Sequence, residues 1–427
     1  MPLEKGLAYN EISNLKSASS KTAWPTYRRD ARRSGHQNLP APLKPNVAWI
    51  SKLTAPITAP VAADGLVIVA ETDRHTVHAL SASDGKPAWA FIADGRIDSP
   101  PTLFDGLCLF GTRNGFVYCL TASDGQLAWR FRAAPADRRI FAYEQLESAW
   151  PVHGSVLVDD KLSGGVPTVY FAAGRSPFTD GGIHLYALQL TTGKVLHKKN
   201  VSIGRGKGKI SQKVLPDILS IENNALWMRG LGVDKNLTPV IDSPHVFAPR
   251  GFLDDTWWHR TYWIYGTKIG GGYTHWPLVG NQSPAGRLLT FDDGDLIYGY
   301  GRMAYRAGDG HVRPDMAKDY KLFGEVLNPA PSAKRQIKWA AQLPFVARSI
   351  VLTRDALLIA GGKSPTENDA SHGQGTFWVA SRKDGSKKDA CTLPAPPVLD
   401  GMALTDQGVF ISAIDGTIIC LRTNNNR

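Results

Sequence analysis

One passage of this chain occurs twice at a fixed distance. Residues 77–91 return as residues 117–131, with an offset of 40 residues at every matched position. The two copies share a Ser-Asp-Gly turn at 83–85 and 123–125, followed by Trp-x-Phe at 89–91 and 129–131. A period of this length is typical of a repeat architecture, because one copy cannot bury its hydrophobic face alone and must stack on the next.

The pattern within each copy predicts β structure. An Asp-Gly turn at 64–65 precedes the apolar run 66–70, a second run follows, and a further Asp-Gly leads into the alternating Trp-x-Phe strand. Four short strands in about 40 residues are the spacing of a propeller blade. We therefore predict an all-β propeller of seven four-stranded antiparallel blades, or eight if the irregular region 230–280 holds another.

The blades can be placed along the chain. We expect six complete blades and a seventh shared by the two chain ends, at about 56–92, 98–132, 152–201, 217–265, 286–341, 346–393 and 401–422 with 46–52. Residues 46–52 match only the last strand of a blade, and residues 401–422 supply the earlier strands. Pairing the two ends closes the ring and removes two exposed sheet edges. Residues 1–22 read as a flexible lead-in and 23–427 as one domain.

The charge balance is basic, with 49 Lys and Arg against 38 Asp and Glu, a formal net charge of +11. This indicates either an anionic partner, such as a polysaccharide or a phospholipid, or simply a soluble basic protein. Nucleic acid is the least expected partner, because no compact recognition module is visible. No run of 18 apolar residues occurs, so no membrane span is predicted, and we expect a monomer.

The four cysteines are too few for a disulfide framework. Cys108 and Cys119 lie on neighbouring predicted strands and could face each other. A register slip of one residue would turn them apart. Small thiols facing the core are the plainer interpretation.

The residue pattern of the repeats resembles that of a known family. Tyr-Ala-Leu at 186–188, Thr-Gly-Lys at 192–194 and the Trp-x-Phe strands are similar to the blade signature of the pyrroloquinoline-quinone-type (PQQ-like) β-propeller repeat. In that family the outer-strand Trp packs between blades, and that place is taken here by Trp49, Trp89, Trp129 and Trp339. The resemblance covers about residues 24–422. The scaffold serves quinoprotein dehydrogenases, outer-membrane assembly lipoproteins and secreted proteins of unknown role, so it implies a fold more than a function.

The resemblance also implies a location. Proteins of this repeat type are usually exported, so we expect a secreted or periplasmic protein whose signal peptide, not visible at Met1, has been removed.

Residues 24–35 resemble the motif that precedes the first blade in exported propellers of this type, where it crosses the propeller before entering the ring. Its closely spaced arginines, flanked by Trp24 and Tyr27, make either an anion site or a set of ion pairs to neighbouring loops. We favour the structural role.

Function is expected on one face of the ring. In a propeller blade, the loop from the second to the third strand and the segment joining two blades lie on the same face and surround the channel. The longest, least repeat-like segments fall there: 138–154, 174–182, 198–213, 252–260, 273–276 and 362–373.

Trp, Tyr, His and Arg on such a rim suit an acidic carbohydrate. Aromatic faces cover sugar rings, and Arg forks hold carboxylate or sulfate groups. The predicted substrate-binding residues are Arg139, Trp150, Trp257, Trp258, His275, Trp276, Lys363 and His372. The alternative is that Trp257 and Trp258 merely fill the channel.

If the protein is an enzyme, the fold suggests β-elimination on a uronate polymer, as in polysaccharide lyases. That reaction needs a cation on the carboxylate, a base and an acid. The cation would be Arg175 or Arg139, the base His153 or His259, and the acid Tyr143 or Tyr273. Whether the protein is catalytic stays open. The alternative is a non-catalytic protein-interaction scaffold like the outer-membrane assembly propellers.

No cofactor is predicted with certainty. Quinone-dependent dehydrogenases of similar repeat wording use adjacent cysteines and a Ca²⁺ site, and no Cys-Cys pair occurs here, so PQQ is not expected. A divalent metal stays possible, because His259 and His275 with Asp254 or Asp255 offer nitrogen and oxygen ligands.

Overall fold

The structure is a computed structural model. It describes residues 2–15, 20–54, 56–142, 144–202, 214–248, 263–267, 276–305, 319–327, 335–363 and 373–423. Strands dominate this part of the chain, with short 3₁₀ helices η1 (Leu7–Asn10), η2 (Ile12–Asn14) and η4 (Trp276–Asn281). Among the described helices, none has the length and apolar character needed to cross a bilayer.

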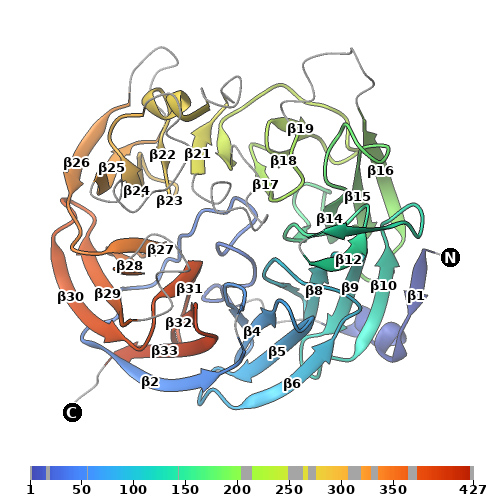
Figure 1. Cartoon of the computed structure of the whole chain (residues 1–427), viewed down its shortest axis with the longest axis horizontal. Coiled ribbons are helices and arrows are strands. Elements are labelled where there is room, and N and C mark those ends of the chain that lie inside the picture. Colours follow the sequence, from blue (N-terminus) through green and yellow to red (C-terminus); the bar gives the residue numbers. More distant parts are fainter. Residues whose placement is uncertain are drawn as a thin grey trace.

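The described strands form eight sheets arranged as blades around a central axis (Figure 1). Blades 1 to 3 comprise β3 (Val61–Ala63), β4 (Leu66–Glu71), β5 (Thr76–Ser81) and β6 (Pro87–Ile92); β7 (Thr102–Phe104), β8 (Leu107–Gly111), β9 (Phe116–Thr121) and β10 (Leu127–Arg132); β13 (Leu157–Asp159), β14 (Thr168–Ala173), β15 (Ile183–Gln189) and β16 (Val195–Val201). Between blades 2 and 3 stands a hairpin of β11 (Arg139–Ala142) and β12 (Gln145–Ser148).

The remaining blades complete the ring. Blades 4 to 8 comprise β17 (Leu219–Glu222), β18 (Ala225–Met228) and β19 (Leu231–Val233); β20 (His245–Phe247), β21 (Trp263–Gly266) and β22 (Ala285–Gly286); β23 (Leu288–Phe291), β24 (Leu296–Arg302), β25 (Tyr320–Val326) and β26 (Ile337–Ala341); β27 (Val346–Leu352), β28 (Ala356–Gly362), β29 (Gly375–Ser381) and β30 (Lys387–Leu393); β31 (Pro397–Thr405), β32 (Gly408–Ala413), β33 (Thr417–Thr423) and β2 (Pro45–Lys52).

The prediction of seven blades is therefore wrong, and its alternative of eight is confirmed. The region expected to hold a single fourth blade contains two three-stranded sheets, blades 4 and 5. The end of the expected fourth blade, 217–265, falls in β21, which lies in the middle of the fifth sheet. These strands are only two to four residues long and lack the Asp-Gly and Trp-x-Phe signature, so the repeat could not be counted there.

The predicted closure of the ring is confirmed. β2 pairs antiparallel with β33, with Trp49 opposite Cys420 and Lys52 opposite Thr417. In Figure 1 the blue β2 lies along the red β33. A further strand, β1 (Leu3–Lys5), extends blade 2 by pairing with the outer strand β10. Part of the expected lead-in thus covers a sheet edge.

The inter-blade tryptophans are also confirmed. The indole N–H groups donate to backbone carbonyls of the next blade, from Trp49 to Ala82 (3.1 Å), Trp89 to Ala122 (2.9 Å), Trp129 to Leu190 (2.9 Å) and Trp339 to Arg382 (3.1 Å). The ring of Trp49 covers Gly85, where φ is +73° and a Cβ atom would lie 2.5 Å from the indole. Glycine is therefore required in this turn both by its backbone and by the packing.

The cysteines behave as core residues. The register puts Cys119 opposite Leu109, so Cys108 and Cys119 point to opposite faces of blade 2 and pack into different hydrophobic clusters. All four cysteines are free thiols.

Candidate functional site

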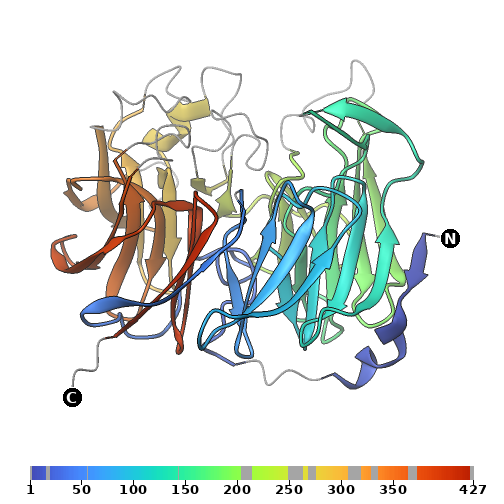
Figure 2. The ribbon, with the colours of Figure 1, turned by 60° about the horizontal axis from the view of Figure 1, so that its bottom comes forward.

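The propeller has two faces (Figure 2). We call loop face the one that carries the second-to-third-strand loops and the blade-joining segments, including the β11–β12 hairpin. We call turn face the opposite one, which carries the turns between first and second strands and between third and fourth strands.

Residues 23–37 fill the centre of the ring (Figure 1). Their carbonyl groups accept hydrogen bonds from the inner strands of four blades, from Leu103 to Pro25 (2.7 Å), Ile221 to Ala31 (2.7 Å), Phe291 to Ser34 (3.1 Å) and Leu352 to Gly35 (2.9 Å). A bridge between Trp24 and Ala62 adds blade 1. The expected crossing of the propeller is thus confirmed, and we call residues 23–37 the axial segment.

Two arginines of the axial segment have the structural role that the sequence favoured. Arg28 forms an ion pair with Asp400 of β31 at 2.9 Å, and both side chains are only 2% exposed. The fully buried Arg33 donates to the carbonyl oxygens of Leu219 and Tyr27, each at 2.9 Å. These bonds satisfy both guanidinium groups inside the protein, as buried charges require.

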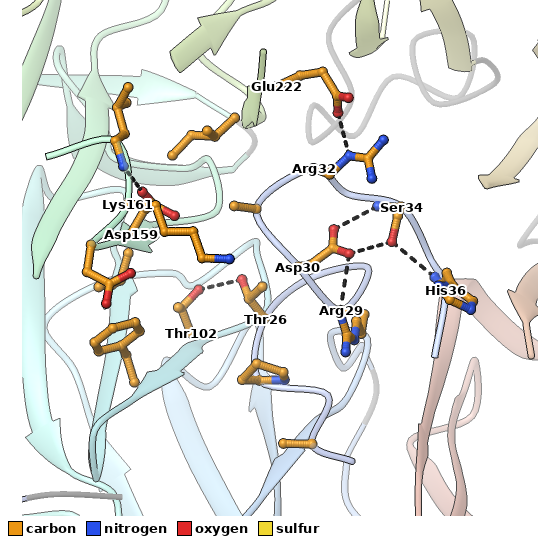
Figure 3. Close-up of a pocket in the computed structure, with 18 of the residues that line it drawn as sticks. Thr26, Arg29, Asp30, Arg32, Ser34, His36, Thr102, Asp159, Lys161 and Glu222 are labelled. Carbon is orange, nitrogen blue, oxygen red and sulfur yellow. Dashed lines mark hydrogen bonds and ion pairs between the residues drawn. The ribbon is translucent and has the colours of Figure 1, made fainter. Parts of the chain in front are cut away.

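A cavity of about 740 Å³ opens on the turn face, beside the axial segment (Figure 3). Residues 29–36 form one wall. The other walls are the first turns of blades 3, 4 and 6, at 159–162, 222–224 and 292–293. The cavity thus joins parts of the chain that are far apart in sequence.

The lining of the cavity carries more negative than positive charge. Six carboxylates and three cations line it, together with His36: Asp30, Asp159, Asp160, Glu222, Asp292 and Asp293 against Arg29, Arg32 and Lys161. Burial lowers the pKa of His36, so it is neutral at physiological pH. The cavity therefore has the opposite sign to the chain as a whole, whose net charge is +11.

Arg32 clamps two of the turns. Its Nε donates to Glu222 at 2.7 Å and its Nη1 to Asp293 at 2.5 Å, while its guanidinium lies 5.1 Å from the centre of the Phe291 ring. Burial raises the pKa of Glu222 despite this ion pair. Asp30 holds the axial segment itself, because its carboxylate accepts from the Ser34 amide (3.0 Å) and the Ser34 hydroxyl (2.5 Å).

Two cations of the cavity are less engaged. The exposed side chain of Lys161 points into the cavity toward Thr26 (Figure 3). Arg29 lies 3.6 Å from Asp30 and 3.5 Å from Gln37, at the limit of ion pairing and hydrogen bonding. These groups can adjust to a ligand without breaking strong contacts.

An apolar crevice of about 310 Å³ continues the cavity between blades 1 and 2. Pro25, Leu103 and Phe104 line both spaces, and most of the other lining side chains of the crevice are apolar, among them Leu15, Ala63, Leu66, Ile68, Leu107 and Ala122. The turn face therefore offers a charged space and an apolar space side by side.

On the loop face, the structure brings together four of the predicted site residues. Gly174 donates to the carbonyl of Pro151, which places the segment of Trp150 and His153 beside Arg175. The Trp150 indole donates to the carbonyl of Asp180 at 2.7 Å. Arg138 pairs with the Asp180 carboxylate at 2.8 Å and so joins the neighbouring Arg139 to the same group of segments.

These side chains are held in ion pairs. Arg175 pairs with Glu147, which also accepts from the buried Arg113 at 3.2 Å. His153 is buried with its Nε2 3.3 Å from Asp217. Arg139 is exposed on the hairpin, 3.8 Å from Asp137. The predicted roles of Arg175 as carboxylate cation and His153 as base remain predictions.

Other predicted residues are spread or lie elsewhere. Lys363 is exposed at the end of β28 in blade 7, which is opposite blade 3 in a ring of eight. The side chain of Trp276, at the start of η4, is not described. Outside the described residues lie Tyr143, Asp254, Asp255, Trp257, Trp258, His259, Tyr273, His275 and His372. In the described part of the chain, no group of three or more His, Cys, Asp or Glu residues is arranged to hold a metal.

The sequence interpretation missed the cavity on the turn face. Its walls are formed by the turns between the first and second strands of the blades. These turns carry Asp, Glu and Asn, as in Asp159-Asp160 and Glu222-Asn223-Asn224. Asp and Asn are favoured in tight turns for their backbone conformation, so these residues looked like turn chemistry alone. The return of an acidic residue at this point in seven of the blades was the available signal.

Comparison with known proteins agrees with the fold. The family model described as outer membrane protein assembly factor BamB matches residues 41–248, just under half of the chain. The comparison with curated proteins found no match.

Two solved structures share the architecture. The quinohemoprotein alcohol dehydrogenase ADHIIG from Pseudomonas putida HK5 is 11% identical with a TM-score of 0.56, covering 99% of this chain and 83% of that one. BamB from Moraxella catarrhalis is 12% identical with a TM-score of 0.50, covering 90% and 99%. At such identities the likeness shows the fold alone. Together with the repeat match, it shows that this chain is a β-propeller whose residues 41–248 match repeats of the PQQ type.

Proposed function

We propose that this protein is a non-catalytic scaffold that docks a protein partner through the loop face, with the β11–β12 hairpin as the main contact. The hairpin carries the observation that supports this most. Phe141 and Leu146 lie opposite each other in its ladder, and they are 73% and 63% exposed. Large apolar side chains that stand together in water mark interaction sites.

The apolar surface extends beyond the hairpin. Phe178, 63% exposed, belongs to the loop that Asp180 ties to Arg138 and Trp150. Figure 2 shows the hairpin standing above the blades at the right of the view. Apolar side chains on a raised segment can enter a pocket of a partner and be fully desolvated there, as binding hot spots are.

The base of the hairpin is rigid. The Ser148 amide donates to the carbonyl of Arg113 at 3.0 Å, and Arg113 itself pairs with Glu147 of β12 and with Asp98. A rigid base lowers the entropy cost of binding, because little must be ordered when the partner arrives.

The family model that matches residues 41–248 supports a scaffold, because it is described as an outer membrane protein assembly factor. Among the described candidates for catalysis, Arg175 pairs with Glu147 and His153 with Asp217, whereas Arg139 is exposed. We further propose an exported location, in keeping with the outer-membrane role in that description.

A second candidate is the binding of an acidic polysaccharide at the loop face, with cleavage by β-elimination. The supporting observation is that Arg138, Arg139 and Lys363 present exposed cations there, with Trp150 close to the first two. Incubation with uronate polymers tests it. Retarded migration of the polymer and unsaturated products support it, and neither effect over a broad panel removes it.

The scaffold is tested by site-specific crosslinking. A photo-crosslinking amino acid at position 141 should capture one partner in cell-envelope extracts, and the purified partner should bind the wild-type protein. The Phe141→Asp/Leu146→Asp variant should bind at least about tenfold more weakly, since two buried apolar side chains are lost from the interface.

Ile92 provides the matched control. It is 76% exposed on the outer strand of blade 1, far from the hairpin in sequence. Ile92→Asp should leave the affinity unchanged. Equal loss of binding in Ile92→Asp, or full binding by the hairpin variant, would show that the hairpin is not the docking site.

A further inference from the structure

We propose that the cavity and the crevice of the turn face together bind a basic peptide segment. A Lys or Arg side chain of the peptide would occupy the cavity, and a neighbouring aliphatic side chain would occupy the crevice. This site lies on the face opposite the hairpin and is independent of the docking function proposed above.

The charge of the cavity selects a cation. Its carboxylates outnumber its lining cations by six to three. The Arg32 guanidinium is already shared between Glu222 and Asp293, and Asp292 pairs with Arg382 at 2.6 Å, so Asp159 and Asp160 carry the excess of negative charge. A ligand that carries a carboxylate would be repelled by this excess of negative charge. An ammonium or guanidinium group would be stabilised by it, more strongly in a partly enclosed space than in water.

Asp160 and Asp105 are the two carboxylates through which the position of the cation can be tested. Asp160 lines the cavity, and Asp105 lines the crevice. Burial is the main cause of the raised pKa of Asp105, and the negative charge of Asp160 raises it further. A cation placed between the two carboxylates would remove this repulsion.

The crevice selects an apolar neighbour. Its volume of about 310 Å³ is twice that of a cavity of about 150 Å³ that admits benzene, so a leucine-sized side chain fits. Because Phe104 borders both spaces, the two groups of the ligand must be adjacent. Consecutive residues of a peptide, one basic and one aliphatic, meet this requirement, whereas a simple metal ion does not.

The walls are formed before a ligand binds. Asp159 accepts from the Leu162 amide at 2.6 Å and so fixes the turn of blade 3. Arg32 holds the turns of blades 4 and 6, as described above. Asn223 and Asn224 have φ of 52° and 57°, which gives a tight hairpin turn. A preformed site loses little entropy on binding.

The test is a titration with short peptides. A fluorescein-labelled peptide of alternating Lys and Leu is added to the full chain, and anisotropy is recorded at low and at physiological salt. Binding that weakens with salt is expected, with no binding of the same peptide carrying Glu in place of Lys. Replacing Leu by Gly in the peptide should weaken binding about tenfold, since one buried aliphatic side chain contributes about that factor.

Two variants on the turn face distinguish an effect of charge on the affinity from an effect of misfolding. Asp105→Asn/Asp160→Asn should weaken binding about fivefold or more, and Lys161→Gln, on the same turn as Asp160, should strengthen it about twofold. Asn tolerates the positive φ of 46° at position 105, so the fold is kept. A gain of affinity in Lys161→Gln cannot result from misfolding.

The proposal fails if neither variant changes the affinity, or if the Glu peptide binds as well as the Lys peptide. It also fails if no peptide binds. If cadaverine, a plain diamine, competes as strongly as the peptide, the site takes a simple cation and the assigned role of the crevice is wrong. None of these outcomes bears on the hairpin, which the crosslinking experiment tests separately.

Discussion

The loop face and the turn face differ in the sign of the charged residues that recur around the central channel. On the loop face, basic residues stand at or just after the end of the second strand in five blades, at Arg113, Arg175, Arg229, Arg302 and Lys363. On the turn face, acidic residues recur in the first turn of the blades, at Asp64, Asp105, Asp160, Glu222, Asp292, Asp355 and Asp406. The net charge of the whole chain therefore says little about either mouth.

Two members of the acidic series have a conformational origin. Asp64 and Asp105 have φ of 50° and 46° in turns that only Gly, Asn and Asp adopt at low cost. Turn-favouring residues at the same place in several blades thus gather carboxylates on one face, whatever their later use. The difference teaches that local turn chemistry can create a ligand site when a fold repeats it.

The largest expected effect is on the axial segment. Arg28→Met should lower the free energy of unfolding by about 3–5 kcal/mol. Among the described residues, it leaves the buried Asp400 carboxylate with the Tyr27 hydroxyl (3.0 Å) and the Trp263 indole (3.2 Å) as its side-chain donors. Chemical denaturation measures it. Arg28→Met/Asp400→Asn should recover part of the loss, and a cost below about 1 kcal/mol for the single variant would contradict a structural role.

A smaller effect is expected at the loop mouth. Arg113→Met should cost about 2 kcal/mol, because Asp98 keeps Arg96 at 2.8 Å and Glu147 keeps Arg175. The same denaturation experiment compares the two variants directly. An equal or larger cost for Arg113→Met would show that these neighbours do not compensate, and the comparison of the two mouths would have to be revised.

The smallest effect is a difference in response to acid. Burial acts to raise the pKa of Asp98, but Arg113 and Arg96 outweigh it and lower the pKa. The stability from Asp98 is thus present above the unfolded pKa of about 3.9 and is lost as pH falls through the lower folded pKa. Glu222, whose pKa is raised by burial, instead favours the folded state as pH falls through its folded pKa toward the unfolded value of about 4.3.

Unfolding of Asp98→Asn and Glu222→Gln between pH 7 and pH 3 tests this difference. The deficit of Asp98→Asn relative to the wild type should shrink at the acid end by about 1 kcal/mol. Glu222→Gln should show the opposite trend and compare best with the wild type at pH 7. Parallel pH profiles of the two variants would refute the assigned directions.

The sequence predicted those parts of the fold that are specified by its repeated motifs. Trp89 and Trp129 occupy the same place in matched copies, so their packing against the next blade follows from the period. The pairing of β2 with β33 follows from two incomplete repeats at the ends. The structural role of Arg28 and Arg33 came from a motif, although their partners could not be read from it.

The remaining parts depend on geometry that spacing does not encode. The fifth blade was hidden because β20 and β22 are short and lack the repeat signature. The cavity on the turn face combines residues near positions 30, 160, 222 and 292, which only the closed ring of eight brings together. An overall positive charge favoured an anionic partner, and this pointed away from an acidic site.

The joining of β2 to β33 has a consequence for synthesis. The ribosome synthesises β2 well before its partner strand, residues 417–423, so the ring cannot close until the chain has been made up to that strand. Until then β2 and the first blades must wait with open edges, which exposes the nascent protein to misassembly and to chaperones. A messenger cut short before these codons would yield a product that lacks the final contact and is a natural substrate for proteolysis.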